Sequence, residues 1–178
     1  MRSFAVTIEL LLASPRSRYE GRPGDGPLPA LEGETPPSIE IRAGLGVVGD
    51  RYFAKPAHRA ASVTLMAMES LEAVASELGL EKIPDAAGTR RNIMLRGFPV
   101  DDLRGAEFTL DSGDGPVGFR GNRPANPCAW MDVVLAPGAF RALRGRGGVR
   151  CEPLTSGVLR LGPATLLVEA RGSAVVAG

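Results

Sequence analysis

Short stretches in which apolar and polar residues alternate recur along this chain, and they constrain its fold more than any other feature. Near the start, Phe4, Val6 and Ile8 alternate with smaller or polar residues, which is the period of a strand. Strand-like stretches follow at 38–43, 62–67, 91–96, 106–111, 116–121, 147–154, 158–161 and 165–170. Turn residues such as Thr155-Ser156-Gly157 and Gly162-Pro163 separate them. Roughly eight or nine short strands at this spacing indicate a barrel or a sandwich.

Helical periodicity is confined to two regions of the sequence. Apolar residues recur at helical spacing over 68–78, and Gly79 stands where it can end the helix. A second region at 130–143 is interrupted by Pro137, which can begin a new helix at its first turn. The strands do not alternate regularly with helices, which disfavours a doubly wound parallel sheet. We therefore expect a mainly β fold with a few short inserted helices.

Length and charge limit the organisation and the partners of the chain. Its 178 residues suit one domain with a full core, so we expect a single domain over 1–178. Residues 13–37 are rich in proline and glycine and are predicted to form a long loop or insertion.

The formal net charge is only +1, so no overall field attracts nucleic acid or an anionic membrane. The apolar run near the N-terminus is short and contains Glu9, which disfavours a signal peptide. No stretch has the length of a membrane span. We expect a cytoplasmic protein with neither a nucleic-acid nor a membrane partner.

The common catalytic motifs do not fit this sequence. Gly44, Gly46 and Gly49 have the spacing of a dinucleotide-binding loop, but the polar, proline-broken segment after them does not predict the helix that such a loop requires. One histidine and two cysteines cannot supply a four-ligand zinc site. No Gly-x-Ser-x-Gly elbow for a serine nucleophile is present.

Cys128 is the most promising residue for chemistry. It ends the segment RPANPC (123–128), between a predicted strand and a predicted helix. Cysteine acts as a thiolate, which helix starts and nearby cations stabilise; the alternative is a small buried hydrophobe. For Cys151, which shares a strand face with Val149, we predict core packing.

Polar residues on the other predicted turns form a candidate set around Cys128. They are Asp50, Arg51, His58, Arg59, Arg90, Arg91, Asn92, Arg123 and Asn126. Together they offer several guanidinium donors and two amides beside one thiol. Such a set suits an anionic ligand whose soft atom meets the thiolate.

The order of these segments resembles the MOSC domain family, named for the C-terminal domain of eukaryotic molybdenum cofactor sulfurase. The similarity is collinear over roughly residues 44–168, which makes it more specific than any one motif. The matching segments are GVVGDR (46–51), SVTL (62–65), ESLEA (69–73), RRNI (90–93), LRGAEF (103–108), RPANPC (123–128), RGGVR (146–150) and GVLRLG (157–162).

The resemblance implies a MOSC-type β-barrel and a role close to the molybdenum cofactor (molybdopterin). In enzyme members that reduce N-hydroxylated compounds, such as the mitochondrial amidoxime-reducing component, a cysteine ligates molybdenum; the corresponding residue here is Cys128. Arginines near the glycine bend and the Arg-Asn pair would bind the pterin phosphate, which implies Arg51, Arg91 and Asn92. Arg123 and Asn126 come from the cysteine segment itself.

Three functions follow from this resemblance and from the residues. The first is a molybdenum-cofactor-dependent reductase that receives electrons from a separate electron-transfer protein. The second is a sulfur carrier that holds a persulfide on Cys128 and acts with a pyridoxal-phosphate cysteine desulfurase. The third is a non-catalytic ligand-binding barrel.

The sequence departs from the family pattern at two positions. Tyr52 stands where the family often has histidine after Gly-Asp-Arg, so His58 either takes its place in space or is an ordinary loop histidine. Pro163 stands where the family usually has Asp, before the last strand.

Overall fold

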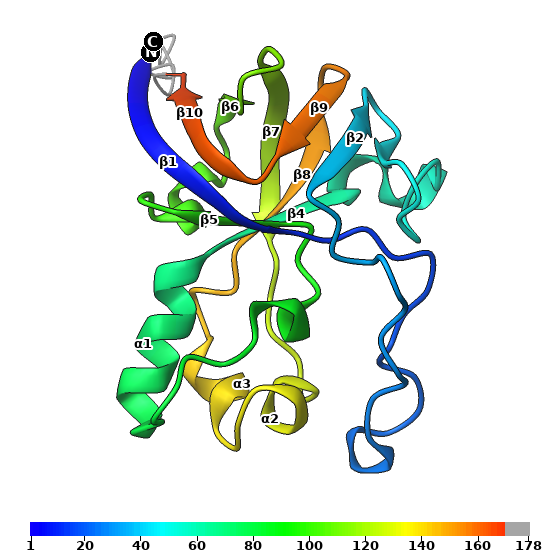
Figure 1. Cartoon of the computed structure of the whole chain (residues 1–178), viewed down its shortest axis with the longest axis vertical. Coiled ribbons are helices and arrows are strands. Elements are labelled where there is room, and N and C mark those ends of the chain that lie inside the picture. The colour runs from blue at the N-terminus through cyan, green and yellow to red at the C-terminus, as the bar shows by residue number, and fades with distance from the viewer. Residues whose placement is uncertain (170–178) are drawn as a thin grey trace, which may run out of the picture.

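Seven strands close into a β-barrel in the structure, a computed structural model that describes residues 1–169 (Figure 1). β1 closes the barrel, because it pairs antiparallel with β10 on one side and with β5 on the other. β4 and β5 run parallel to each other. In order around the barrel, the strands are β1 (Arg2–Leu11), β10 (Gly162–Val168), β6 (Glu107–Asp111), β7 (Val117–Pro124), β8 (Val149–Pro153), β4 (Val63–Ala67) and β5 (Ile93–Arg96).

A second sheet of three strands lies beside the barrel. Its order is β3 (Gly46–Val47), β2 (Ser38–Arg42) and β9 (Gly157–Arg160). The glycine-rich stretch after β2 turns the chain back, and its middle pairs with β2 as β3. Gly46 can do this because it has a φ of 110° and lies against Ser62, where a Cβ atom would come within 2.9 Å of the serine Cβ.

The helices are few and short, as the periodicity predicts. The predicted helix over 68–78 is confirmed as α1 (Met68–Leu78), and Gly79 ends it in the left-handed conformation with a φ of 63°. Pro137 separates the second region into α2 (Met131–Val134) and α3 (Ala139–Ala142). Four short 3-10 helices complete the described elements: η1 (Pro23–Asp25), η2 (Pro56–Ala61), η3 (Ala86–Thr89) and η4 (Val100–Leu103).

One predicted turn is wrong. Gly162 and Pro163 are the first residues of β10, where they pair with Ile8 and Thr7 of β1. A proline is tolerated there because it begins the strand. The predicted last strand also included Ala170, which lies outside the described residues.

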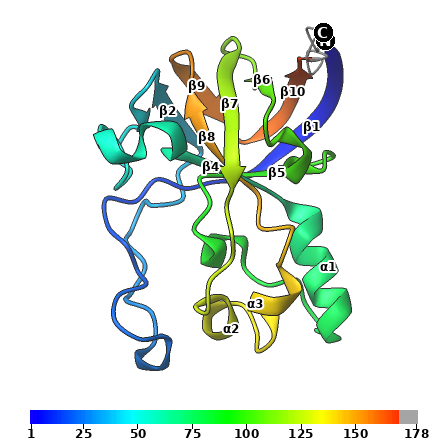
Figure 2. The ribbon, with the colours of Figure 1, turned by 180° about the vertical axis from the view of Figure 1, so that it is seen from behind.

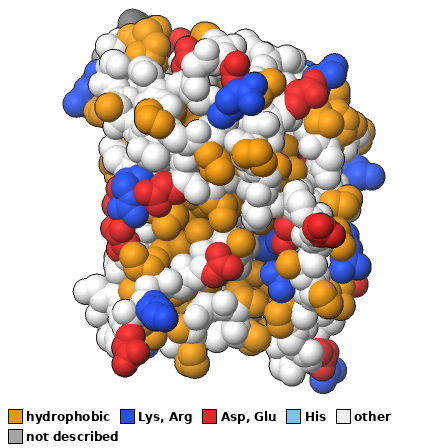
Figure 3. All heavy atoms as spheres, viewed as in Figure 1, with side chains coloured by type: hydrophobic (Ala, Val, Ile, Leu, Met, Phe, Trp, Pro, Cys, Tyr) orange, Lys and Arg blue, Asp and Glu red, His pale blue; other side chains and the backbone are white. Residues whose placement is uncertain are grey.

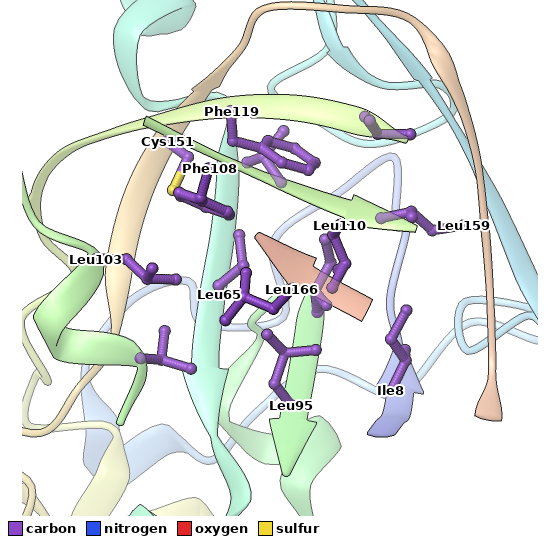
Figure 4. Packing of buried hydrophobic residues seen from close by; sticks show 14 of the residues in the cluster. Ile8, Leu65, Leu95, Leu103, Phe108, Leu110, Phe119, Cys151, Leu159 and Leu166 are labelled. Carbon is purple, nitrogen blue, oxygen red and sulfur yellow. The ribbon is translucent and has the colours of Figure 1, made fainter. Parts of the chain in front are cut away.

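Two hydrophobic clusters stabilise the fold. The larger one fills the barrel and includes Phe108, Phe119 and the buried Cys151 (Figure 4). The smaller one lies beneath the three α-helices and contains Trp130 and Met131. Charged side chains of both signs are scattered over the face seen in Figure 3, with no single field of one sign.

Residues 13–37 form one long irregular segment, which we call the strap. The strap extends past the barrel on the side of α2 and α3 (Figures 1 and 2). Its two arms are tied by hydrogen bonds from the Ala13 amide to the Glu34 carbonyl, 2.9 Å, and from the Leu28 amide to the Arg18 carbonyl, 2.8 Å. Its one helical turn is η1. Among residues 1–169, no helix combines the length and the apolar character that crossing a membrane requires.

Candidate functional site

Cys128 lies in the loop that joins β7 to α2, at the end of the barrel from which the helices extend (Figure 2). The Ala125 amide ties the start of this loop to the Gly148 carbonyl at 2.8 Å, and the Cys128 carbonyl accepts a bond of 3.0 Å from the Met131 amide. Between these anchors the side chain of Cys128 is exposed. The predicted position between a strand and a helix is thus confirmed, and the thiol is open to solvent.

The second cysteine has the opposite environment. Cys151 is completely buried in the barrel core, as the strand alternation predicts. Burial raises the pKa of its thiol far above the ordinary value, so Cys151 stays protonated and unreactive in the folded state. The chain therefore presents one accessible thiol, on Cys128.

Arg91 holds the Cys128 loop in place. Its Nε donates to the Gly147 carbonyl at 3.0 Å, and its Nη2 donates to the Ala125 carbonyl at 2.7 Å. Burial, with a further contribution from the charge of Arg150, lowers the pKa of Arg91 to about 10. The guanidinium still carries its charge at neutral pH, but most of its donors are engaged by backbone carbonyls of the site.

Asn92 is also engaged within the protein. Its side chain is buried at 3% exposure, and its Oδ1 accepts bonds from the amide and hydroxyl of Thr64 at 2.9 and 3.0 Å. Its Nδ2 donates to the Leu12 carbonyl at 3.0 Å and to Oδ2 of Asp50 at 3.1 Å. Burial raises the pKa of Asp50, and Asn92 fixes where that carboxylate lies.

Arg51 begins a row of aromatic and basic side chains. Its guanidinium lies 4.7 Å from the centre of the Tyr52 ring, and its Nη2 is 3.3 Å from the Tyr52 hydroxyl. The Tyr52 ring is in turn 4.5 Å from the ring of His58, which comes from η2. His58 therefore does lie beside the position that follows Gly-Asp-Arg in the sequence.

An open cleft brings together three of the predicted residues, His58, Arg123 and Asn126. Its volume is about 380 Å³, and its lining residues are Tyr52, His58, Arg123, Pro124, Asn126 and Arg150. A narrower cavity shares Tyr52 and Arg150 with the cleft and also contacts Asp50, Arg51, Arg90, Arg91 and Asn92. The narrow cavity measures about 20 Å³, which is room for about one water molecule.

Two arginines of the cleft keep their donors free. Arg123 and Arg150 lie opposite each other on β7 and β8. Within residues 1–169, neither guanidinium has a hydrogen bond or an ion pair with another side chain or with the backbone. Sequence reasoning did not single out Arg150; its position beside Gly147-Gly148, which packs against the Cys128 loop, is the available signal. Free guanidinium groups in a cleft are suited to oxyanions.

Sequence comparison finds no relatives: no protein-family model matches the chain, and no curated protein does. Solved structures do match. The YuaD protein from Bacillus subtilis superposes with a TM-score of 0.72 at 15% identity, covering 95% of this chain and 98% of that one. YiiM from Escherichia coli gives 0.59 at 14% identity, covering 96% and 71%. YiiM from Geobacillus stearothermophilus gives 0.52 at 20% identity, covering 64% and 57%.

These likenesses concern the fold. Together with the closed barrel and its few short helices, they confirm the mainly β, MOSC-like barrel that the sequence resemblance implies.

Proposed function

We propose that this protein binds the molybdenum cofactor through the thiolate of Cys128 and reduces N-hydroxylated compounds with electrons from a separate protein. The observation that carries the proposal is a pair of guanidinium groups, Arg123 and Arg150, that have no partner within residues 1–169 and line a cleft. Asn126, from the loop that carries the exposed Cys128, lines the same cleft, and Cys128 itself lies outside that lining. A soft thiolate beside free guanidinium groups suits a metal attached to an anionic organic group.

The donor set fits such a cofactor. Cys128 would hold the metal, and Arg123, Arg150 and Arg51 would bind the phosphate and the polar edges of the pterin. Asn126 adds an amide to the cleft, whose volume of about 380 Å³ falls in the range of small-molecule sites, roughly 300–1,000 Å³. When bound, the cofactor would supply the two electrons that, with two protons, convert an N–OH group into N–H and water.

Other residues of the protein hold the site in position. Arg91 fixes the loop that carries Cys128, because its guanidinium binds the carbonyls of Ala125 and Gly147. Asn92 fixes the buried Asp50 through Nδ2. We therefore assign Arg91 and Asn92, which the family resemblance implies as phosphate ligands, to positioning the site.

Metal analysis tests this proposal directly. Protein purified from a host that makes the cofactor is expected to contain molybdenum, and Cys128→Ala is expected to lose it. Cys151→Ala is the matched control, because Cys151 is buried in the barrel and should not affect the metal content. Wild-type protein without molybdenum, or Cys128→Ala protein that retains it, would refute the proposal.

The exposure of Cys128 favours a second candidate, a persulfide carrier. A pyridoxal-phosphate cysteine desulfurase would pass its sulfane sulfur to the Cys128 thiolate and recover its own thiol. Incubation with such an enzyme and cysteine should then add one sulfur atom to Cys128 by mass spectrometry. If neither molybdenum nor sulfur is found on Cys128, the third alternative, a non-catalytic ligand-binding barrel, is the function to pursue.

A further inference from the structure

The strap is fastened to the body of the protein next to the site. Glu34 and Arg90 form a two-pronged ion pair, with Nη1 to Oε1 at 2.7 Å and Nη2 to Oε2 at 3.1 Å. Both side chains are buried, at 5% and 3% exposure. Arg90 directly precedes Arg91, which holds the Cys128 loop. The strap and the thiol loop are therefore anchored to adjacent residues of one segment.

A second anchor of the strap lies close to Cys128. The ring of Tyr19 stacks on Trp130, with centroids 5.1 Å apart and planes inclined by 15°, and its hydroxyl donates to the Gly88 carbonyl. Trp130 follows Cys128 by two residues and is only 8% exposed. Tyr19 covers it while remaining half-exposed itself, so the strap adds an aromatic surface beside the thiol loop.

The electrostatics also relate Tyr19 to the thiol. Burial is the main cause that raises the pKa of the Tyr19 hydroxyl, and the charge of a Cys128 thiolate adds to it, whereas Arg90 and Arg18 oppose the rise. Tyr19 is therefore near enough to Cys128 for the charges to interact.

We propose that Tyr19 is a specificity-determining residue of the Cys128 site, where its fixed ring favours flat, unsaturated ligands over ligands without a planar group. Stacking orients a planar molecule without forming a directional bond. The Tyr19 ring is already held by its contact with Trp130 and by its hydroxyl, which reduces the entropy lost when a ligand stacks on it. The inference rests on the proposed function only in taking Cys128 as the place where ligands react.

Thiol reactivity measures this selectivity without any metal. The probes are 2,2′-dithiodipyridine, which is flat and aromatic, and iodoacetamide, which is small and has no ring. In the first reaction the Cys128 thiolate attacks a sulfur atom, forms a mixed disulfide and releases pyridine-2-thiolate; in the second it displaces iodide. Tyr19→Ala is expected to lower the ratio of the first rate to the second about threefold to tenfold, the effect of one lost stacking contact.

Two matched variants complete the experiment. Tyr19→Phe keeps the ring and is expected to keep the wild-type ratio, whereas Glu20→Gln changes an exposed neighbour on the strap and should also leave the ratio unchanged. Emission from Trp130, the single tryptophan, reports whether the strap remains docked. An unchanged ratio in Tyr19→Ala, or an equal loss in Glu20→Gln, overturns the inference. A failed molybdenum measurement leaves this test intact, because no step of it needs the cofactor.

Discussion

At the scale of single residues, the site shows that one type of side chain, arginine, has two different roles at two positions. Arg91 and Arg150 both contact the narrow cavity, yet Arg91 is bound to carbonyls of the protein and Arg150 has free donors. Both arginines lie in segments that match the family pattern, RRNI (90–93) and RGGVR (146–150). The sequence cannot tell them apart, because the carbonyls that engage Arg91 belong to residues 34 and 56 positions away in the chain.

The free arginines predict how the cleft binds anions. Arg150→Gln is expected to weaken the binding of inorganic pyrophosphate about tenfold or more, because a hydrogen bond to a charged group contributes about 1.5–3 kcal/mol. Isothermal titration calorimetry on the purified protein measures the change. Arg42→Gln is the control, since Arg42 lies on β2 and pairs with Glu40; an equal loss in that variant would assign the effect to net charge.

At the scale of elements, local patterns predict much of the structure, but not the pairing between distant segments. The bounds of α1 follow from the apolar spacing of Met68, Leu71 and Leu78 and from Gly79. The ion pair of Glu34 with Arg90, 56 residues apart, has no local signal, and neither did the return of β3 onto β2. The strap was thus predicted as an irregular segment, while its place beside the Cys128 loop could not be predicted.

The junction of β8 with its preceding loop depends on a glycine. Gly148 has a φ of 91°, and a Cβ atom there would lie 2.0 Å from the Leu65 carbonyl oxygen. Gly145 has a φ of 78° with nothing within 4 Å. We expect Gly145→Ala to cost about 1–2 kcal/mol of unfolding free energy from backbone strain alone. Gly148→Ala should cost at least about 2 kcal/mol more because of the clash.

Urea denaturation of both variants measures this difference. Equal costs for the two substitutions would mean that β4 moves aside without penalty and that the close approach to Leu65 is not a tight constraint.

The anchor between Glu34 and Arg90 predicts a dependence of stability on pH. Burial by itself raises the pKa of Glu34, but the hydrogen bond and the charge of Arg90 outweigh it, so the pKa is lowered below the ordinary value of 4.5. A carboxylate with a lowered pKa in the folded state contributes stability above its unfolded pKa. That stability is lost as the pH falls through the folded pKa.

Glu34→Gln should therefore cost about 3–5 kcal/mol at neutral pH, since it leaves Arg90 buried without a counter-charge. The difference from wild type should shrink as the pH falls below 4.5. Urea titrations over a pH series test both statements. If the difference in unfolding free energy between wild type and Glu34→Gln stays constant at acid pH, protonation of Glu34 is not linked to folding.

At the scale of the whole molecule, closure of the barrel is the feature that local sequence patterns do not predict. A sheet of short strands predicts a barrel or a sandwich equally well. The decision depends on β1, which bridges β10 and β5 by changing register between Ile8 and Leu10. Such a bulge bends the strand and lets one strand serve two neighbours.

The register of β1 with β10 also has a consequence for circular permutation of the chain. Arg2 lies directly opposite Val168, so the start of the first strand and the end of the last one meet as the two ends of a hairpin would. A short turn could join them, and new termini could be opened at Pro23–Asp25 in the strap, where circular permutation is best tolerated. We expect the permuted protein to keep the circular-dichroism spectrum of the original, because the barrel is defined by which strands are neighbours and not by the order in which they are synthesised.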